Sequence, residues 1–169
     1  MIFDELKRRH TRLLTRHCRF ECGEGWTDIL DRLFIDLVTV LPVDAAFAIL
    51  QVKEKFGGLR VNHRAEPALP TKTLWAIDRL IAIAEARSFH TCESCGRPGQ
   101  LWNGSGFYFT ACDRHAARYG DGHYRRTAVA VERKSPFHDR FEDERKWYRY
   151  DPARDDFVPS PPPDSFEER

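Results

Sequence analysis

The sequence lacks long apolar runs and carries no marked excess of charge of either sign. Its apolar stretches span only a few residues each, too short to cross a membrane. The first residues, MIFDELKRRHTRLLTRH, are interrupted by charges throughout and lack the apolar core of an export signal. With 27 basic and 26 acidic side chains, the net charge of +1 does not indicate non-specific binding of nucleic acid by the whole surface. These absences predict a cytoplasmic protein with no membrane partner.

The sequence also lacks the short motifs of several enzyme classes. It contains no phosphate-binding P-loop, no dinucleotide-binding glycine pattern and no nucleophile elbow. A zinc deaminase needs a Glu two residues after its first metal ligand, and the residues that follow Cys112 do not supply one. We therefore expect a binding protein rather than an enzyme, with a metal-dependent hydrolase or nuclease as the alternative. The histidines that such a hydrolase would use are His63, His123 and His138.

The composition is that of a globular protein with a core. Hydrophobic residues make up 41% of the chain and charged residues 31%. Apolar residues recur at helical spacing in three segments. This periodicity predicts helices over about 3–17, 26–40 and 72–88.

Strands are expected between and after these helices. Apolar and polar residues alternate from Phe47 to His63 around Phe56-Gly57-Gly58, which predicts a β-hairpin with its turn at the two glycines. Residues 127–132 (TAVAVE) are typical of a strand, and residues 147–159 (WYRYDPARDDFVP) of a second hairpin. We expect an α+β fold in which helices pack on a hairpin or small antiparallel sheet.

The domain organisation follows from length and composition. A chain of 169 residues suits one domain with a tail. We predict a single α+β domain over residues 1–158. The last residues, 159–169, are rich in proline and polar side chains, which predicts a flexible tail.

Four residues in the middle of the chain have the spacing of a zinc site. Cys92 and Cys95 form a C-x2-C pair, and after sixteen residues Cys112 and His115 form a C-x2-H pair. Gly96 permits the tight turn that aims both sulfurs of the first pair at one ion. Three thiolates and one imidazole suit a tetrahedral zinc ion. We predict one structural zinc ion per chain, with His90 or His123 as alternatives to His115 for the fourth ligand.

The residues around the two ligand pairs match the treble-clef arrangement. Trp102 to Thr110 is typical of a short hairpin, and Asp113 to Tyr119 of a helix that ends at Gly120. A knuckle, a hairpin and a helix with the last two ligands form a treble clef over about residues 90–120. Four protein ligands leave no position for water, so the ion is expected to be structural. The hairpin has no histidine or acidic residue to act as the base of a nuclease.

Two further cysteines lie near the N-terminus. Cys18 and Cys22, with His10 and His17 nearby, invite the hypothesis of a second metal site. Their C-x3-C spacing is a weak pattern, and no second pair follows at zinc-finger spacing. We favour one core cysteine and one that faces solvent.

Two basic segments are candidates for contact with a partner. The first surrounds the hairpin turn at Phe56, and the second follows His115, where arginines alternate with Tyr119 and Tyr124. Arginine beside aromatic rings can hold phosphates and stack on bases. The alternative for both is a solvated surface balanced by the acidic C-terminal part. The predicted contact residues are Lys53, Lys55, Arg60, Arg118, Arg125 and Arg126.

Four motifs in this order, ECGEGW (21–26), QVKEKFGGLR (51–60), CESCGRPG (92–99) and CDRH (112–115), carry a family resemblance. Over roughly residues 20–116 the chain resembles a family of small uncharacterised bacterial and bacteriophage proteins. The resemblance implies a zinc-binding domain found on mobile elements and implies no known activity. With it, we expect a non-enzymatic protein-interaction module that acts on a host factor or toxin. A zinc-finger protein that binds DNA or RNA is the alternative.

Overall fold

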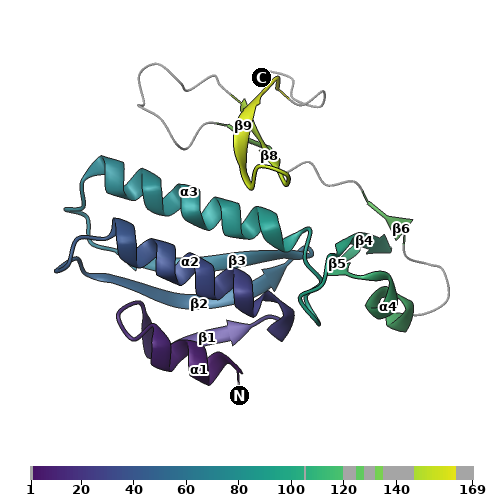
Figure 1. Cartoon of the computed structure of the whole chain (residues 1–169), viewed down its shortest axis with the longest axis horizontal. Coiled ribbons are helices and arrows are strands. Elements are labelled where there is room, and N and C mark those ends of the chain that lie inside the picture. Colours follow the sequence, from purple (N-terminus) through teal and green to yellow (C-terminus); the bar gives the residue numbers. More distant parts are fainter. Residues whose placement is uncertain (1, 105, 120–124, 128–131, 135–146, 163–169) are drawn as a thin grey trace.

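The computed structural model describes residues 2–104, 106–119, 125–127, 132–134 and 147–162 (Figure 1). Its first part is a three-stranded sheet of order β1-β2-β3, in which β2 runs parallel to β1 and antiparallel to β3. Two long helices, α2 and α3, lie side by side over this sheet (Figure 1). The bounds are β1 Leu14–Glu21, α2 Thr27–Val40, β2 Phe47–Lys55, β3 Gly58–Ala65 and α3 Thr71–Ser88. The α+β class predicted from the sequence is confirmed.

The predicted helices at 26–40 and 72–88 are confirmed because their apolar positions meet a real core. Leu30, Phe34 and Leu37 of α2 are fully buried, as are Ile49 and Val52 of β2. The predicted hairpin is confirmed as β2 and β3. Phe56 and Gly57 form its turn with φ angles of 53° and 79°. Positive φ at both central residues of a two-residue turn matches the right-handed twist of the strands.

The prediction of one helix over 3–17 is wrong in its second half. Helix α1 spans only Ile2–Arg9, and the chain then turns into β1. Leu6, Leu13 and Leu14 are all buried, as expected for a helical face, but the last two belong to the turn and the strand. Parallel pairing with β2 overrides the local helical pattern, and the sheet is mixed rather than antiparallel throughout.

Polar contacts attach α1 and the turn after it to α2. Nε2 of His10, which is 7% exposed, lies 2.6 Å from Oδ1 of Asp31, and Arg9 contacts the other carboxylate oxygen at 3.1 Å. Arg12 donates to the carbonyl oxygens of Val38 and Leu41 at the end of α2. A cation at a helix C-terminus satisfies carbonyls that have no partner within the helix.

A second small sheet follows α3, in the order β5-β4-β6. The predicted hairpin over 102–110 is confirmed as β4 and β5, which pair from Gln100↔Ala111 to Gly104↔Phe107. The predicted helix over 113–119 is shorter than expected, because α4 gives way to the 3-10 turn η2, and Gly120 lies outside the described residues. The bounds are β4 Gln100–Gly104, β5 Phe107–Ala111, α4 Asp113–Ala116, η2 Ala117–Tyr119 and β6 Arg125–Arg126.

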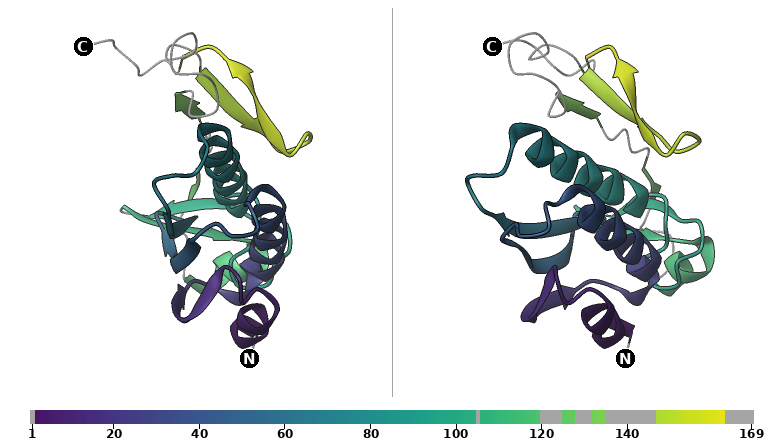
Figure 2. Two further views of the ribbon diagram at one scale, coloured as in Figure 1. Left: turned by 90° about the vertical axis from the view of Figure 1, so that its left-hand side faces the viewer. Right: turned by 60° about the vertical axis from the view of Figure 1, so that its left-hand side comes forward.

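A third sheet, of order β7-β8-β9, lies against α3 on the side away from the first sheet (Figure 2). Its strands are β7 (Glu132–Lys134), β8 (Trp147–Asp151) and β9 (Asp156–Ser160), so the second predicted hairpin is confirmed. Most of the strand predicted over 127–132 falls outside the described residues. Strand β9 continues to Ser160, into the segment predicted as a tail. The single domain over 1–158 stays a prediction.

The turn of the β8–β9 hairpin is fixed to both long helices through Asp155. Its carboxylate accepts hydrogen bonds of 2.6 Å from Nε of Arg87 and from the Tyr150 hydroxyl, and it lies 3.6 Å from Arg32 of α2. Burial raises the pKa of Asp155, but the hydrogen bonds from Arg87 and Tyr150 and the arginine charges outweigh it and hold the pKa below its ordinary value. Below the turn, Ala82, Ile83 and Ala86 of α3 pack on the aromatic rings of the hairpin.

We expect Asp155→Asn to lower the free energy of unfolding by about 2 kcal/mol at pH 7, because asparagine keeps the shape and tolerates the φ of 53° but loses the charge. A carboxylate with a lowered pKa stabilises the fold above its ordinary pKa of 3.8, so the difference from wild type should narrow only as the pH falls below that value. Urea unfolding at several pH values measures this difference in the free energy of unfolding. Asp151→Asn in the same hairpin is the control, since Asp151 is about as exposed as Asp155 but lies 3.6 Å from an exposed arginine, Arg154, and accepts no hydrogen bond from Arg87 or Tyr150. An equal loss in both variants would contradict the role of Asp155.

Candidate metal centre

Cys92 and Cys95 lie in a knuckle directly after α3. Thr91 and Pro98 form an isolated β-bridge, and the amide of Cys92 donates to the carbonyl of Arg97 at 2.8 Å. The chain reverses between them, where Gly96 has a φ of 72° and its amide donates to the Cys92 carbonyl at 2.9 Å. Gly96 therefore has the left-handed conformation that the sequence predicted for the turn.

Cys112 and His115 lie beside the knuckle cysteines, after the last strand of the β4–β5 hairpin. Cys112 follows the last residue of β5 and is the N-cap residue of α4, and His115 lies one turn into that helix. The amides of His115 and Ala116 both donate to the Cys112 carbonyl, at 3.0 and 2.9 Å. This turn holds the imidazole beside the sulfur.

The side chains of Cys92, Cys95, Cys112 and His115 form one group that could hold a metal ion. Their ligand atoms all lie within 4.8 Å of one another. The sulfurs of Cys95 and Cys112 are 3.9 Å apart, and Nδ1 of His115 lies 3.4 Å from the Cys92 sulfur and 3.3 Å from the Cys112 sulfur. Bond lengths of about 2.3 Å to sulfur and about 2.0 Å to nitrogen give tetrahedral edges of about 3.8 Å and about 3.5 Å. The group can therefore hold a metal ion.

The backbone around the site favours thiolates. Hydrogen bonding from the His115 amide is the main cause that lowers the pKa of Cys112, and the Arg114 amide adds to it. Burial raises the pKa of Cys92, opposed by the amides of Ser94 and Cys95, among others. Amides directed at sulfur stabilise the deprotonated form that a metal binds.

His90, Cys18 and Cys22 are not part of this group. His90 stacks on Tyr150 at 6.0 Å, and His123 lies outside the described residues. Cys18 is 2% exposed in the main core, and Cys22 is half-buried, with a pKa that burial raises to about 12. Within the part of the chain that the structure describes, no second group of metal-binding side chains occurs.

The ECGEGW segment packs directly on the knuckle. Glu93 receives two backbone hydrogen bonds of 2.8 Å, one on its side chain from Gly23 and one on its carbonyl from Gly25. The Trp26 ring, which has no exposed surface, donates from Nε1 to the Thr91 carbonyl at 2.9 Å. A Cβ on Gly25 would lie 2.3 Å from the Cys92 carbonyl oxygen. Glycine is therefore required at position 25 for close approach of two backbones.

The hairpin turn at Phe56 packs on β4 and β5, which together with the knuckle and α4 form the metal module within residues 90–119. The hydroxyl of Thr110, which is buried, donates to the Gly57 carbonyl at 2.6 Å, and a Cβ on Gly57 would collide with Leu101. The next residue, Gly58, faces the ring of Phe89. These contacts between distant segments were not predicted from the sequence. The signal that could have found them was the glycines themselves, Gly25, Gly57 and Gly58.

The predicted contact residues lie partly on β2 and β3 and partly on η2 and β6, and they differ in burial and in ion pairing. Arg60 lies 3.6 Å from Glu85, and Arg126 donates to Asp113 at 2.8 Å while covering the Trp102 ring at 5.4 Å. Their charges are therefore partly neutralised. Lys53 is half-buried on β2, whereas Lys55 and Arg118 are exposed, and Arg125 belongs to β6.

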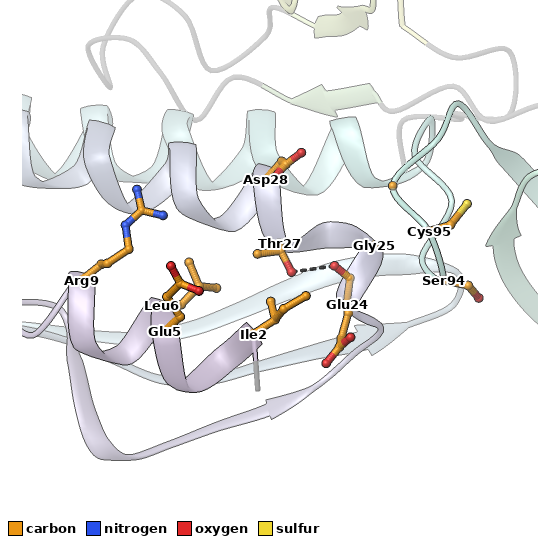
Figure 3. Close-up of a pocket in the computed structure, with 11 residues that line it drawn as sticks. Ile2, Glu5, Leu6, Arg9, Glu24, Gly25, Thr27, Asp28, Ser94 and Cys95 are labelled. Atoms are coloured by element: carbon orange, nitrogen blue, oxygen red, sulfur yellow. Dashed lines mark hydrogen bonds between the residues drawn. The ribbon is translucent and has the colours of Figure 1, made fainter.

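A pocket of about 370 Å³ lies between α1, the start of α2 and the knuckle (Figure 3). Its lining includes the carboxylates of Glu5, Glu24 and Asp28, with Arg9 on one side and Cys95 at the metal site. No histidine lines it. His63, predicted as a possible catalytic group, is instead half-buried on β3 and stacks on Phe47 at 5.2 Å, and desolvation lowers its pKa.

Comparisons with protein-family models, with curated proteins and with solved structures found no match for this chain. No helix within the described residues is long and apolar enough to span a membrane.

We expect Cys95→Ser to abolish stable metal binding and to lower the free energy of unfolding by more than about 4 kcal/mol, because the ion loses one of its four ligands. Cys95 is exposed, so the substitution leaves no cavity that could account for the loss. Metal analysis of the purified protein should find about one zinc per chain in wild type and much less in the variant. Cys22→Ser is the matched control and should keep the wild-type metal content. Full metal content and stability in Cys95→Ser would refute the site.

Gly25→Ala tests the packing of the ECGEGW segment on the knuckle. The added methyl would collide with the carbonyls of Cys92 and Glu93, so we expect a loss of about 3 kcal/mol or more in stability and faster release of the metal. The control is Gly106→Ala, on the turn between β4 and β5. Its methyl would lie in open space at a φ of 85°, so it should cost only about 1 kcal/mol. Urea unfolding and zinc release to a chromogenic chelator measure both; similar behaviour of the two variants would argue against the close contact.

Proposed function

We propose that the chain is a non-enzymatic binding protein whose recognition surface is held in shape by one structural zinc ion at Cys92, Cys95, Cys112 and His115. The observation that carries the proposal is the double attachment of the module that contains these ligands. The ECGEGW segment packs on the knuckle, and the Phe56 turn packs on Thr110 and Leu101. Knuckle, hairpin and short helix together support the treble-clef assignment.

A structural role for the metal agrees with the small core of the module. Among the described residues, its buried cluster holds only Cys92, Phe109, Ala111 and Ala116. So little apolar surface cannot stabilise an independent fold, whereas zinc binding contributes about 10 kcal/mol or more to such segments. Four protein ligands also complete the tetrahedron and leave no position for a reactive water. Both points favour binding over the hydrolase alternative.

The outer side of the module is where a partner has access. The attachments described above use the knuckle backbone, Leu101 and Thr110, while Phe107 and Tyr119 remain 53% and 46% exposed. The partner class first expected from the sequence, a host protein or toxin, stays a prediction, as does the resemblance to bacterial and bacteriophage proteins on which it depends.

A photoreactive phenylalanine analogue at position 107 tests where the partner binds. In extracts of the source cell, the zinc-loaded protein should crosslink to one or a few partners from position 107. The control position is Val43, which is 86% exposed on the loop after α2 and far from the module in sequence. Equal crosslinking from both positions would refute the proposal. So would turnover of a substrate together with X-ray absorption spectra that show a zinc ion with an open coordination position.

A further inference from the structure

One face of the first sheet lies away from α2 and α3. Residues directly opposite each other in neighbouring strands project to the same face, and successive residues of a strand alternate between the two faces. The opposite residues Phe20, Val52 and Val61 belong to the core that the two helices cover (Figure 1). The residues before and after each of them therefore project to the other face. They form the rows Arg19, Gln51 and Asn62, and Glu21, Lys53 and Arg60.

This other face carries mainly cations and amides. Lys55 and Arg64 extend it, because they lie two residues beyond Lys53 and Asn62 on their strands. We call the two rows and these two residues the basic sheet face. It includes the contact residues that the sequence predicted around the hairpin turn, and the sheet register adds Arg19 and Arg64 to them.

Two basic residues of this face oppose each other. Lys53 of β2 and Arg60 of β3 form a directly opposite pair, and like charges in such a pair destabilise a sheet. Arg60 lies 3.6 Å from Glu85 of α3, which partly neutralises it, whereas Lys53 forms no ion pair with another described residue. The fold gains no ion pair from this lysine, and a polyanion on the sheet would.

Positive charge remains on the basic sheet face after its acidic group is counted. Glu21 lies 3.7 Å from Arg19 and accepts a hydrogen bond of 2.8 Å from Gln51. Lys55 and Arg64 are exposed and form no ion pair within the described part of the chain. At about 3.3 Å per residue, these two cations lie about 20 Å apart along the strands, which is the length of about six base pairs.

We propose that the basic sheet face binds the phosphate backbone of double-stranded DNA. None of its side chains is aromatic or apolar. A protein partner would need an apolar centre in the interface, and a single strand would need rings on which bases stack. The two amides, which could otherwise recognise the 2′-hydroxyls of RNA, are joined by a hydrogen bond of 3.0 Å from Asn62 to Gln51. The cations therefore make the contacts, and phosphates are the groups that they recognise.

The basic sheet face contains none of the zinc ligands. The inference therefore goes beyond the proposed function and can fail without it. A contact confined to phosphates positions a duplex without reading its sequence. Two DNA duplexes of unrelated sequence should consequently bind alike.

Fluorescence anisotropy of the zinc-loaded full chain with two labelled DNA duplexes of about 20 base pairs tests the proposal. We expect both to bind with affinities within about twofold of each other, which fall steeply between about 50 and about 200 mM salt. Lys53→Gln/Arg64→Gln should weaken binding about tenfold or more and reduce the slope of log K against log salt by about 1.8, as for two lost phosphate contacts.

The matched control is Lys72→Gln/Arg118→Gln, which removes the same charge from exposed positions on α3 and η2. Neither residue forms an ion pair with another described residue. This control should bind within about twofold of wild type, because its charges lie outside the basic sheet face.

Asn62→Glu separates binding from folding. The new carboxylate would lie between Arg60 and Arg64 on β3, so stability should stay equal or rise, whereas the affinity for DNA should fall about tenfold or more. The unfolding midpoint and the zinc content are measured for every variant.

Any of three results with folded protein would overturn the inference: no binding of DNA at low salt, equal losses in the Lys53/Arg64 pair and its control, or unchanged binding by Asn62→Glu. Competition identifies a different ligand. Equally tight binding of oligo-glutamate would indicate an acidic protein, of oligo(dT) a single strand, and tighter binding of duplex RNA an RNA partner; each would replace the proposal.

Discussion

Backbone contact between the ECGEGW segment and the metal knuckle is the constraint on which the arrangement of the chain depends. The amide of Gly25 donates to the Glu93 carbonyl at 2.8 Å, and the indole of Trp26 donates to the Thr91 carbonyl. Trp26 is also the N-cap residue of α2 and part of the main core. The same few residues therefore start the helix that covers the sheet and hold the module that carries the ligands. Displacement of the knuckle would disturb both.

This coupling explains how a module with few buried side chains is held at the end of α3. The last turn of α3 contributes too, because the buried hydroxyl of Ser88 accepts a 2.8 Å hydrogen bond from the amide of Leu59 and donates to the Glu85 carbonyl. The Phe56 turn is thereby fixed between helix and module. Metal binding at the four ligands and packing of the two segments act on the same structure, so each should strengthen the other.

Some arginines of the chain form ion pairs within the fold and others do not, although the overall charge is close to zero. Arg87 and Asp155, Arg60 and Glu85, and Arg126 and Asp113 pair within the fold. Arg97, Arg114 and Arg118 are exposed and form no ion pair with another described residue. A net charge of +1 is thus compatible with a local basic surface, since composition averages over groups that the fold separates.

The sequence by itself determined the features that depend on local chemistry. The ligand spacing predicted which four side chains meet, because two short C-x2 turns bring each pair together before any tertiary contact forms. Periodicity predicted α2, α3 and three hairpins. Tertiary structure alone decided that Leu13 and Leu14 leave a helical pattern for β1, since pairing with β2 is a contact between distant segments. It also decided why Gly25 and Gly57 are glycines and which arginines stay available. Each of these depends on contacts between segments that are far apart in the sequence, and no local pattern in the chain contains that information.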